Sequence, residues 1–356
     1  MHKKNEKSAW EGKISNHLQL GGIETSVLDN GPGKGVRIAW INTGSGLRYK
    51  VVIDRAMDIA DAFYNQHSLA WLSHTGINSP RPDCDRDLEW LSTFAGGLVT
   101  TCGLSHIGGP ESDEFGKRGL HGKISNIPAN LESIVQPDIK AGNLDMSITG
   151  VMKESKVFGP NLELRRTIAG TLGSPEIRIS DKVTNYGNTS AAHMILYHCN
   201  FGWPIVDEGT KIIWQGKCVS RGSENDDAIF NDKMNYKVCC KPTDKHRGVG
   251  EACGYTDVKT DKKGMCKVGL CNNKLKLALM LEYNKKQLPC MANWQHWGYG
   301  EYVTALEPGT NPPIGQKKAR ERNQLIYLEP GESRMYELKI SVLTDQKHIK
   351  EFTSIG

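Results

Sequence analysis

Three short segments combine proton-transferring side chains with residues that form tight turns. They are Arg118-Gly119-Leu120-His121-Gly122, Tyr197-His198-Cys199-Asn200 and Ala305-Leu306-Glu307-Pro308-Gly309. Imidazole and carboxylate groups can serve as general acids and bases near neutral pH when their surroundings tune their pKa values. We therefore treat His121, His198 and Glu307 as candidate catalytic residues.

Each of these residues also has a purely structural interpretation. His121 could simply sit beside a hairpin turn, and Glu307 could be a surface residue before a Pro-Gly turn. His198 follows an apolar run and could be a core histidine, but a strand end there would present it to a cleft. In strand geometry Asn200 shares a face with His198, which makes Asn200 a candidate for ligand binding.

Two further groups could bind a ligand. Arg55 and Asp58 lie among apolar neighbours, where they could form an ion pair or, alternatively, contact hydroxyl groups. Aromatic residues gather just before Glu307, with Trp297 at the centre of the group. Aromatic rings suit the C–H face of a sugar, and they equally suit a hydrophobic core.

Strands must position these residues, because alternating apolar and polar residues recur along the chain. The pattern occurs at residues 36–41, 47–53, 144–148, 162–168, 176–183, 276–283 and 335–343. It is typical of antiparallel sheets with one solvated face. Only residues 85–94 suggest a short helix, and strands do not alternate with helices. We predict an all-β fold, one large antiparallel β-sandwich domain over residues 1–356, with 1–30 forming an N-terminal extension or edge strands.

Composition excludes several classes of function. Lys and Arg outnumber Asp and Glu by only 45 to 40, which argues against nucleic-acid binding. No segment approaches the ~20 apolar residues of a membrane span, and the charged N-terminus does not resemble an export signal. Dinucleotide, nucleotide, serine-hydrolase and zinc-protease motifs are missing, so we expect no cofactor.

The ten cysteines include no Cys-x-x-Cys pair. Together with the N-terminus, this predicts a cytoplasmic protein with free thiols and no metal. Five cysteines lie in residues 239–271, where a structural zinc site is the alternative.

The order of the motifs resembles the aldose 1-epimerase family, as a divergent branch of the galactose mutarotase-like superfamily. The resemblance runs from Val36 to Leu343 and rests on residues 54–59, 96–104, 119–122, 198–202 and 305–308. It implies a β-supersandwich of the galactose mutarotase type, with the site across the concave face of the larger sheet. Where galactose mutarotases carry an asparagine before the second histidine, this chain has Tyr197.

The resemblance also implies roles. His198 would be the general acid, Glu307 the general base and His121 a donor to the ring oxygen, with Arg55 holding sugar hydroxyls. We add Asp58, Asn200 and Trp297 as substrate-binding candidates. The expected reaction interconverts the anomers of a free or modified sugar, in a monomer or homodimer. It needs an ionised Glu307 and a protonated His198, whose pKa a nearby carboxylate would raise. A non-catalytic sugar sensor and a carbohydrate lyase or hydrolase are the alternatives.

Overall fold

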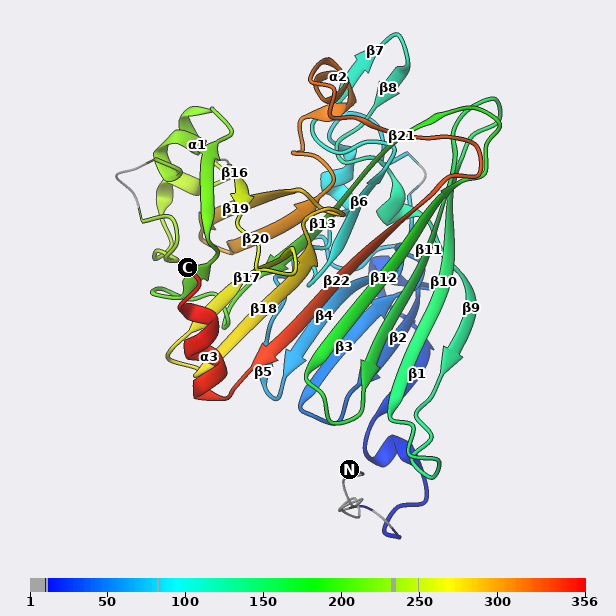
Figure 1. Cartoon of the computed structure of the whole chain (residues 1–356), viewed down its shortest axis with the longest axis vertical. Helices are drawn as coiled ribbons and strands as arrows, with labels where there is room; N and C mark the ends of the chain where they lie inside the picture. Colours follow the sequence, from blue (N-terminus) through cyan, green and yellow to red (C-terminus); the bar gives the residue numbers. More distant parts are fainter. Residues whose placement is uncertain (1–9, 11, 82, 232–234, 249) are drawn as a thin grey trace.

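Antiparallel strands make up most of the protein in a computed structural model that describes residues 10, 12–81, 83–231, 235–248 and 250–356 (Figure 1). The described strands form four sheets, and all of their named pairings are antiparallel. The all-β prediction is therefore confirmed.

The largest sheet has eight strands, and its long members cross the front of Figure 1. Alternation builds it: in β11 every second residue is buried, because one face meets the core and the other meets water. In spatial order the strands are β14 (Lys211–Ile213), β17 (Met265–Asn272), β18 (Leu277–Asn284), β22 (Ser333–Leu343), β12 (Glu176–Asn185), β11 (Asn161–Thr171), β10 (Asp145–Ser155) and β9 (Asn130–Val135).

The seven-stranded sheet carries the candidate site, because His198 and Glu307 both lie on its strands; the expectation that the site lies on the larger sheet, which has eight strands, is therefore wrong. Its central strand β13 (Ala191–Phe201) is buried almost throughout, as expected of a strand covered on both faces. The other strands are β15 (Gly216–Ser220), β16 (Ala252–Val258), β19 (Cys290–Gly298), β20 (Glu301–Gly309) and β21 (Ile326–Leu328), with β6 (Thr100–Leu104) also pairing with β13.

The N-terminal strands form a five-stranded meander, and a two-stranded hairpin stands apart from it. The meander runs β1 (Gly22–Val27), β2 (Arg37–Asn42), β3 (Leu47–Val52), β4 (Asp58–Tyr64) and β5 (His67–Ser68). The hairpin is β7 (Glu111–Asp113) with β8 (Gly116–Arg118), beside α2 at the top of Figure 1. β1 is an edge strand of the meander. Residues 1–9 and 11 lie outside the described residues, and the expectation for 1–30 stays a prediction.

Helices are short in the described chain. The α-helices are α1 (Glu224–Ile229), α2 (Gly315–Glu321) and α3 (Gln346–Thr353). The 3₁₀ turns are η1 (His17–Gln19), η2 (Gly31–Gly33), η3 (Glu89–Thr93), η4 (Ile124–Asn126) and η5 (Asp244–His246). The helix expected over 85–94 is therefore only the 3₁₀ turn η3, flanked by irregular chain.

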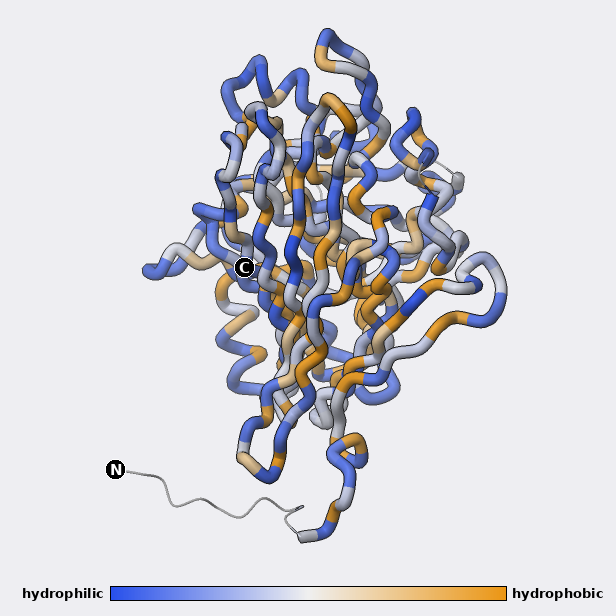
Figure 2. Tube along the Cα trace, turned by 90° about the vertical axis from the view of Figure 1, so that its right-hand side faces the viewer, coloured by the Kyte–Doolittle hydropathy of each residue, from blue (hydrophilic) through white to orange (hydrophobic). Residues whose placement is uncertain are grey.

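One cluster of buried apolar side chains extends from Ile23 to Val342 and draws on the three larger sheets. Figure 2 shows the alternation that builds it, with orange and blue residues succeeding each other along the strands. The prediction of a single domain fits this shared cluster and stays a prediction. No helix in the described part of the chain is long and apolar enough to cross a bilayer.

Candidate active site

A histidine and a glutamate meet at the centre of the seven-stranded sheet. The register that pairs Leu196 with Gly309 and Cys199 with Leu306 puts His198 on β13 opposite Glu307 on β20. Directly opposed side chains of an antiparallel pair lie on the same face of the sheet. His198 Nε2 is accordingly 3.1 Å from Glu307 Oε1. The two residues are 5% and 3% exposed, so the pair is almost dry.

The pair forms the floor of a cleft of about 340 Å³. Such a volume falls within the usual range for small-molecule sites. η3, the loops after β6 and β8 and the residue that follows β15 form the walls, together with β16 and β19. The lining residues are Leu88, Trp90, Leu91, Phe94, Gly108, Gly109, Pro110, Leu120, His121, His198, Arg221, Glu251, Cys253, Trp294, Glu307 and Pro313.

His121 enters the cleft from the loop after β8. Its backbone is left-handed, with φ of 58°, and backbone bonds with Gly103 and Gly108 hold it there. The Gly108 N–H also donates to His121 Nδ1 at 3.4 Å. Because Nδ1 accepts this bond, the proton of the neutral ring sits on Nε2. The His121 and His198 ring centres are 6.0 Å apart.

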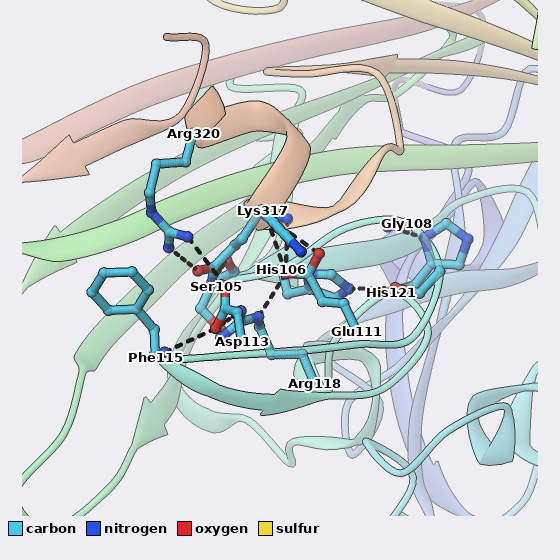
Figure 3. Close-up of polar contacts among 12 residues, drawn as sticks. Ser105, His106, Gly108, Glu111, Asp113, Phe115, Arg118, His121, Lys317 and Arg320 are labelled. Atoms are coloured by element: carbon cyan, nitrogen blue, oxygen red, sulfur yellow. Dashed lines mark hydrogen bonds and ion pairs between the residues drawn. The ribbon is translucent and has the colours of Figure 1, made fainter. Parts of the chain in front are cut away.

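Gly108 is held by its surroundings, which Figure 3 shows in part. A side chain at Gly108 would lie 2.6 Å from the Gly315 nitrogen, so only glycine fits there. His106 Nε2 donates to the Gly109 carbonyl at 2.9 Å, and its other nitrogen is 3.6 Å from Glu111. These contacts hold in place the loop of Gly108 and Gly109, which contacts His121.

Glu111 fastens the hairpin to α2 (Figure 3). Its carboxylate accepts hydrogen bonds from Arg118 Nε at 2.8 Å and from the backbone N–H groups of Gln316 at 3.1 Å and Lys317 at 3.2 Å. The residue before α2, Ile314, offers no side-chain cap, so Glu111 caps this helix from another element.

Aromatic rings surround His198. Phe94 and Trp294 lie 5.2 Å and 5.5 Å from its ring, and Trp90 stacks on Phe94 at 4.3 Å. This apolar shell keeps water away from the pair, and it decides the charge state there.

Burial lowers the pKa of His198 to about 4, while Asn200 raises that pKa to a lesser extent. Burial also raises the pKa of Glu307 well above its usual value, and the charge of Glu251 adds to the effect. For His121, burial and then the neighbouring His198 lower the pKa well below its usual value. We expected a raised pKa for His198; the shift is in the opposite direction, because burial disfavours the charged imidazolium.

Arg55 and Asp58 lie outside the cleft, around a separate void of about 20 Å³. Arg55 donates from Nη2 to the Thr93 carbonyl at 2.8 Å and from Nη1 to Asn78 Oδ1 at 2.8 Å. It thus anchors η3, which carries Trp90. The Asp58 carboxylate accepts from Thr101 Oγ1 at 2.6 Å and lies 3.2 Å from Arg166.

Asn200 and Trp297 are buried beside the cleft but do not line it. Asn200 Nδ2 donates to the Gly97 carbonyl at 3.0 Å and to the His198 carbonyl at 2.9 Å, so it supports the strand that bears His198. Trp297 packs on Tyr302 and donates to Gln295 Oε1 at 3.2 Å.

Sequence reasoning missed an ion-pair group at the mouth of the cleft. Arg221 bonds to Asp226 at 2.9 Å and to Glu251 at 2.6 Å, and Glu251 accepts from Trp294 Nε1 at 2.7 Å. Trp294 carried a usable signal, since it lies in the aromatic group before Glu307. Arg221 and Glu251 stand in polar segments without a motif.

Comparison with known proteins places the chain in a family. Residues 33–342 match the family model described as "Domain of unknown function (DUF4432)". The chain belongs to this family. No curated protein matches it. Among the described residues, no group of three or more His, Cys, Asp or Glu side chains could hold a metal ion.

Solved structures show the same fold. A "putative aldose 1-epimerase" from Klebsiella pneumoniae aligns with a TM-score of 0.85 and 22% identity, over 96% of this chain and 89% of the other. A galactose mutarotase-like protein from Clostridium acetobutylicum has a TM-score of 0.63 and 10% identity, over 90% and 98%. A galactose 1-epimerase from Lactobacillus acidophilus has a TM-score of 0.56 and 11% identity, over 90% and 98%. The predicted galactose mutarotase-type fold is therefore confirmed.

Proposed function

We propose that this DUF4432 protein interconverts the anomers of a free sugar by opening and reclosing the ring. The observation that supports this most directly is the His198–Glu307 contact on the floor of an aromatic cleft. The reaction needs one group to take a proton and one to give a proton at neighbouring oxygens. Two titratable side chains 3.1 Å apart could serve the anomeric hydroxyl and the ring oxygen of one sugar.

The chemistry follows from the proton balance. One group removes the proton of the anomeric hydroxyl while the other protonates the ring oxygen, so the C1–O5 bond breaks and an aldehyde forms. The C1–C2 bond then rotates, and the reverse transfers close the ring on the other face of the aldehyde. His121 would donate from Nε2 to the ring oxygen or to a neighbouring hydroxyl.

The His198–Glu307 pair holds one exchangeable proton for ring opening and closing. Burial lowers the pKa of His198 and raises that of Glu307, which favours placing that proton on Glu307 and keeping His198 neutral. Ring opening then starts with Glu307 as acid and His198 as base, and ring closure reverses the two roles. The assignment that the resemblance implies, with His198 as acid, differs by one proton transfer within the pair.

The test is anomer exchange by saturation-transfer NMR over a panel of aldoses. Glu307→Gln and His198→Asn should each lower any catalysed rate at least ~100-fold, because each removes a positioned acid or base. Glu301→Gln, on the same strand, and His348→Asn, on α3, are matched controls that should leave the rate unchanged. Full activity in both site variants would refute the assignment. Sugar binding without exchange would indicate the sensor alternative.

A cytoplasmic location and a monomeric or homodimeric state complete the proposal.

A further inference from the structure

The mouth of the cleft is apolar to a degree that proton transfer does not require. Leu88 and Leu91 flank Trp90 in the chain, line the cleft and are 56% and 50% exposed. Leu120 and Pro110 continue this lining. Large aliphatic side chains left half in water at a binding cleft are a surface that an apolar part of a ligand can cover.

Polar groups in the walls are already engaged within the protein. Trp90 Nε1 donates to Ser125 Oγ at 3.2 Å, and Trp294 Nε1 donates to Glu251. The guanidinium of Arg221 is shared between Asp226 and Glu251. A ligand hydroxyl that approached either indole N–H would have to break one of these bonds, whereas Glu251, whose side chain is 44% exposed, can still accept a further one.

The same group sets the charge at the mouth. One guanidinium faces two carboxylates, Asp226 and Glu251, so the net charge is negative. Glu307 lies below and feels the charge of Glu251. A ligand carboxylate or phosphate would therefore meet repulsion, and the cleft favours a neutral ligand.

Beyond Arg221 and Glu251 at the mouth, three of the described lining side chains have nitrogen or oxygen atoms with hydrogen-bonding capacity for a ligand: His121, His198 and Glu307. Glu307 is 3% exposed, and its Oε1 makes no hydrogen bond of good geometry within the described chain. These three groups are enough to hydrogen-bond the anomeric hydroxyl, the ring oxygen and one neighbouring hydroxyl of a sugar. Each further hydroxyl buried against leucine would lose its hydrogen bonds to water without gaining a partner.

We propose that the cleft takes a neutral deoxy aldose, a 6-deoxyhexose whose methyl group packs against Leu88 and Leu91. This names the substrate class of the proposed function and rests on it for the ring opening; the binding preference does not depend on catalysis. A methyl group needs no hydrogen-bond partner, and its burial against leucine is favourable.

The first experiment compares matched sugars that differ by one oxygen. Anomer exchange is measured for 6-deoxy-D-glucose against D-glucose and for 6-deoxy-L-galactose against L-galactose, with D-glucose 6-phosphate as the anionic member. We expect kcat/KM to favour at least one deoxy sugar over its parent about tenfold or more, as apolar pockets discriminate at this scale. If neither deoxy sugar exceeded its parent, or if the phosphate equalled or exceeded both deoxy sugars, the proposal would be overturned.

A binding measurement separates this inference from the proposed function. Calorimetry with the full-length protein uses the same five sugars. Preferential binding of a deoxy sugar without exchange would refute the proposed reaction and leave the substrate class standing. Anomer exchange without preferential binding of a deoxy sugar would support the proposed reaction and refute the substrate class. If none of the five sugars binds, the substrate class is wrong.

Variants at the mouth test which residues carry the preference. Leu91→Gln should reduce the deoxy-to-parent ratio at least threefold, since it gives the parent hydroxyl a partner and removes the apolar contact. Met335→Gln on β22 is the control, because Met335 is similarly exposed at 48% and lies outside the lining. An unchanged ratio in Leu91→Gln, with the protein folded, would contradict the role given to Leu91.

Discussion

At the residue scale, the cleft is governed by one buried acid–base pair. Two opposite charges in a dry site are costly, and the neutral arrangement avoids that cost. This is why His198 has a lowered pKa and Glu307 a raised one even though they touch. Tyr197 points to the other side of β13, where its hydroxyl donates to Asp181 Oδ2 at 2.7 Å. Tyr197, the residue that differs from the mutarotase motif, therefore lies in the core and not in the cleft.

The pH dependence of the proposed activity follows from these directions. A neutral His198 can accept a proton, and this ability is lost as pH falls through its pKa of about 4. Activity should persist well below pH 6, whereas an ordinary histidine would give a limb near ~6.5. Exchange rates from pH 3.5 to 8, corrected for the uncatalysed reaction, test this. An acid limb near ~6.5 would contradict the assignment, because it would mean that the catalytic histidine titrates with an ordinary pKa.

At the element scale, a hairpin and a helix far apart in the chain control one loop of the cleft. β7–β8 and α2 are joined through Glu111, and the loop before β7 contacts α2's first residue at Gly108. That loop supplies the N–H that fixes the tautomer of His121. Glu111 is thus a positioning residue, acting on the cleft through Gly108.

Replacing Glu111 tests this relay. Glu111→Gln should weaken the helix cap and the bond to Arg118, let the loop move, and lower kcat/KM by up to about 100-fold. The ¹⁵N shifts of His121 should move toward a tautomer mixture, which a purely structural loss would not produce. Glu114→Gln, at the exposed tip of the same hairpin, is the control. Unchanged His121 shifts in Glu111→Gln would refute the relay.

At the scale of the whole molecule, one buried arginine connects the three larger sheets. Arg166 on β11 makes paired bonds to Asp181 on β12 at 2.9 Å and 2.6 Å, and it also lies 3.2 Å from Asp58 at the start of β4. Its Nη1 donates to Thr101 Oγ1 on β6 at 2.8 Å. Such a network fixes how the sheets sit relative to each other, and with them the floor of the cleft.

Neighbouring arginines provide a matched test of this network. Arg166→Met should lower the free energy of unfolding by about 3–5 kcal/mol, because it leaves buried carboxylates without their partner. Arg165→Met removes only a surface pair with Glu132, whose side chains are 50% and 41% exposed, and should cost no more than about 1 kcal/mol. Urea unfolding of both variants measures the difference, and equal losses would contradict the assignment.

The strands could be predicted because alternation reports one buried face directly, as in β11 and β12. The prediction of a helix at residues 85–94 was wrong because the apolar residues there line a cleft and do not form one face of a helix. Leu88 and Leu91 stay half exposed, while Trp90 is buried. Local periodicity cannot distinguish these two environments.

The sequence by itself determined the sheet-forming pattern, the family-like order of motifs, and the residue types that meet on the floor of the cleft. Only the tertiary structure decided that Arg55 and Asp58 are engaged in a separate buried network, that Arg221 and Glu251 lie at the mouth, and that burial lowers the pKa of His198 and raises that of Glu307. The physical reason is that alternation depends on neighbours in the chain. Desolvation and ion pairing depend on which distant segments pack together.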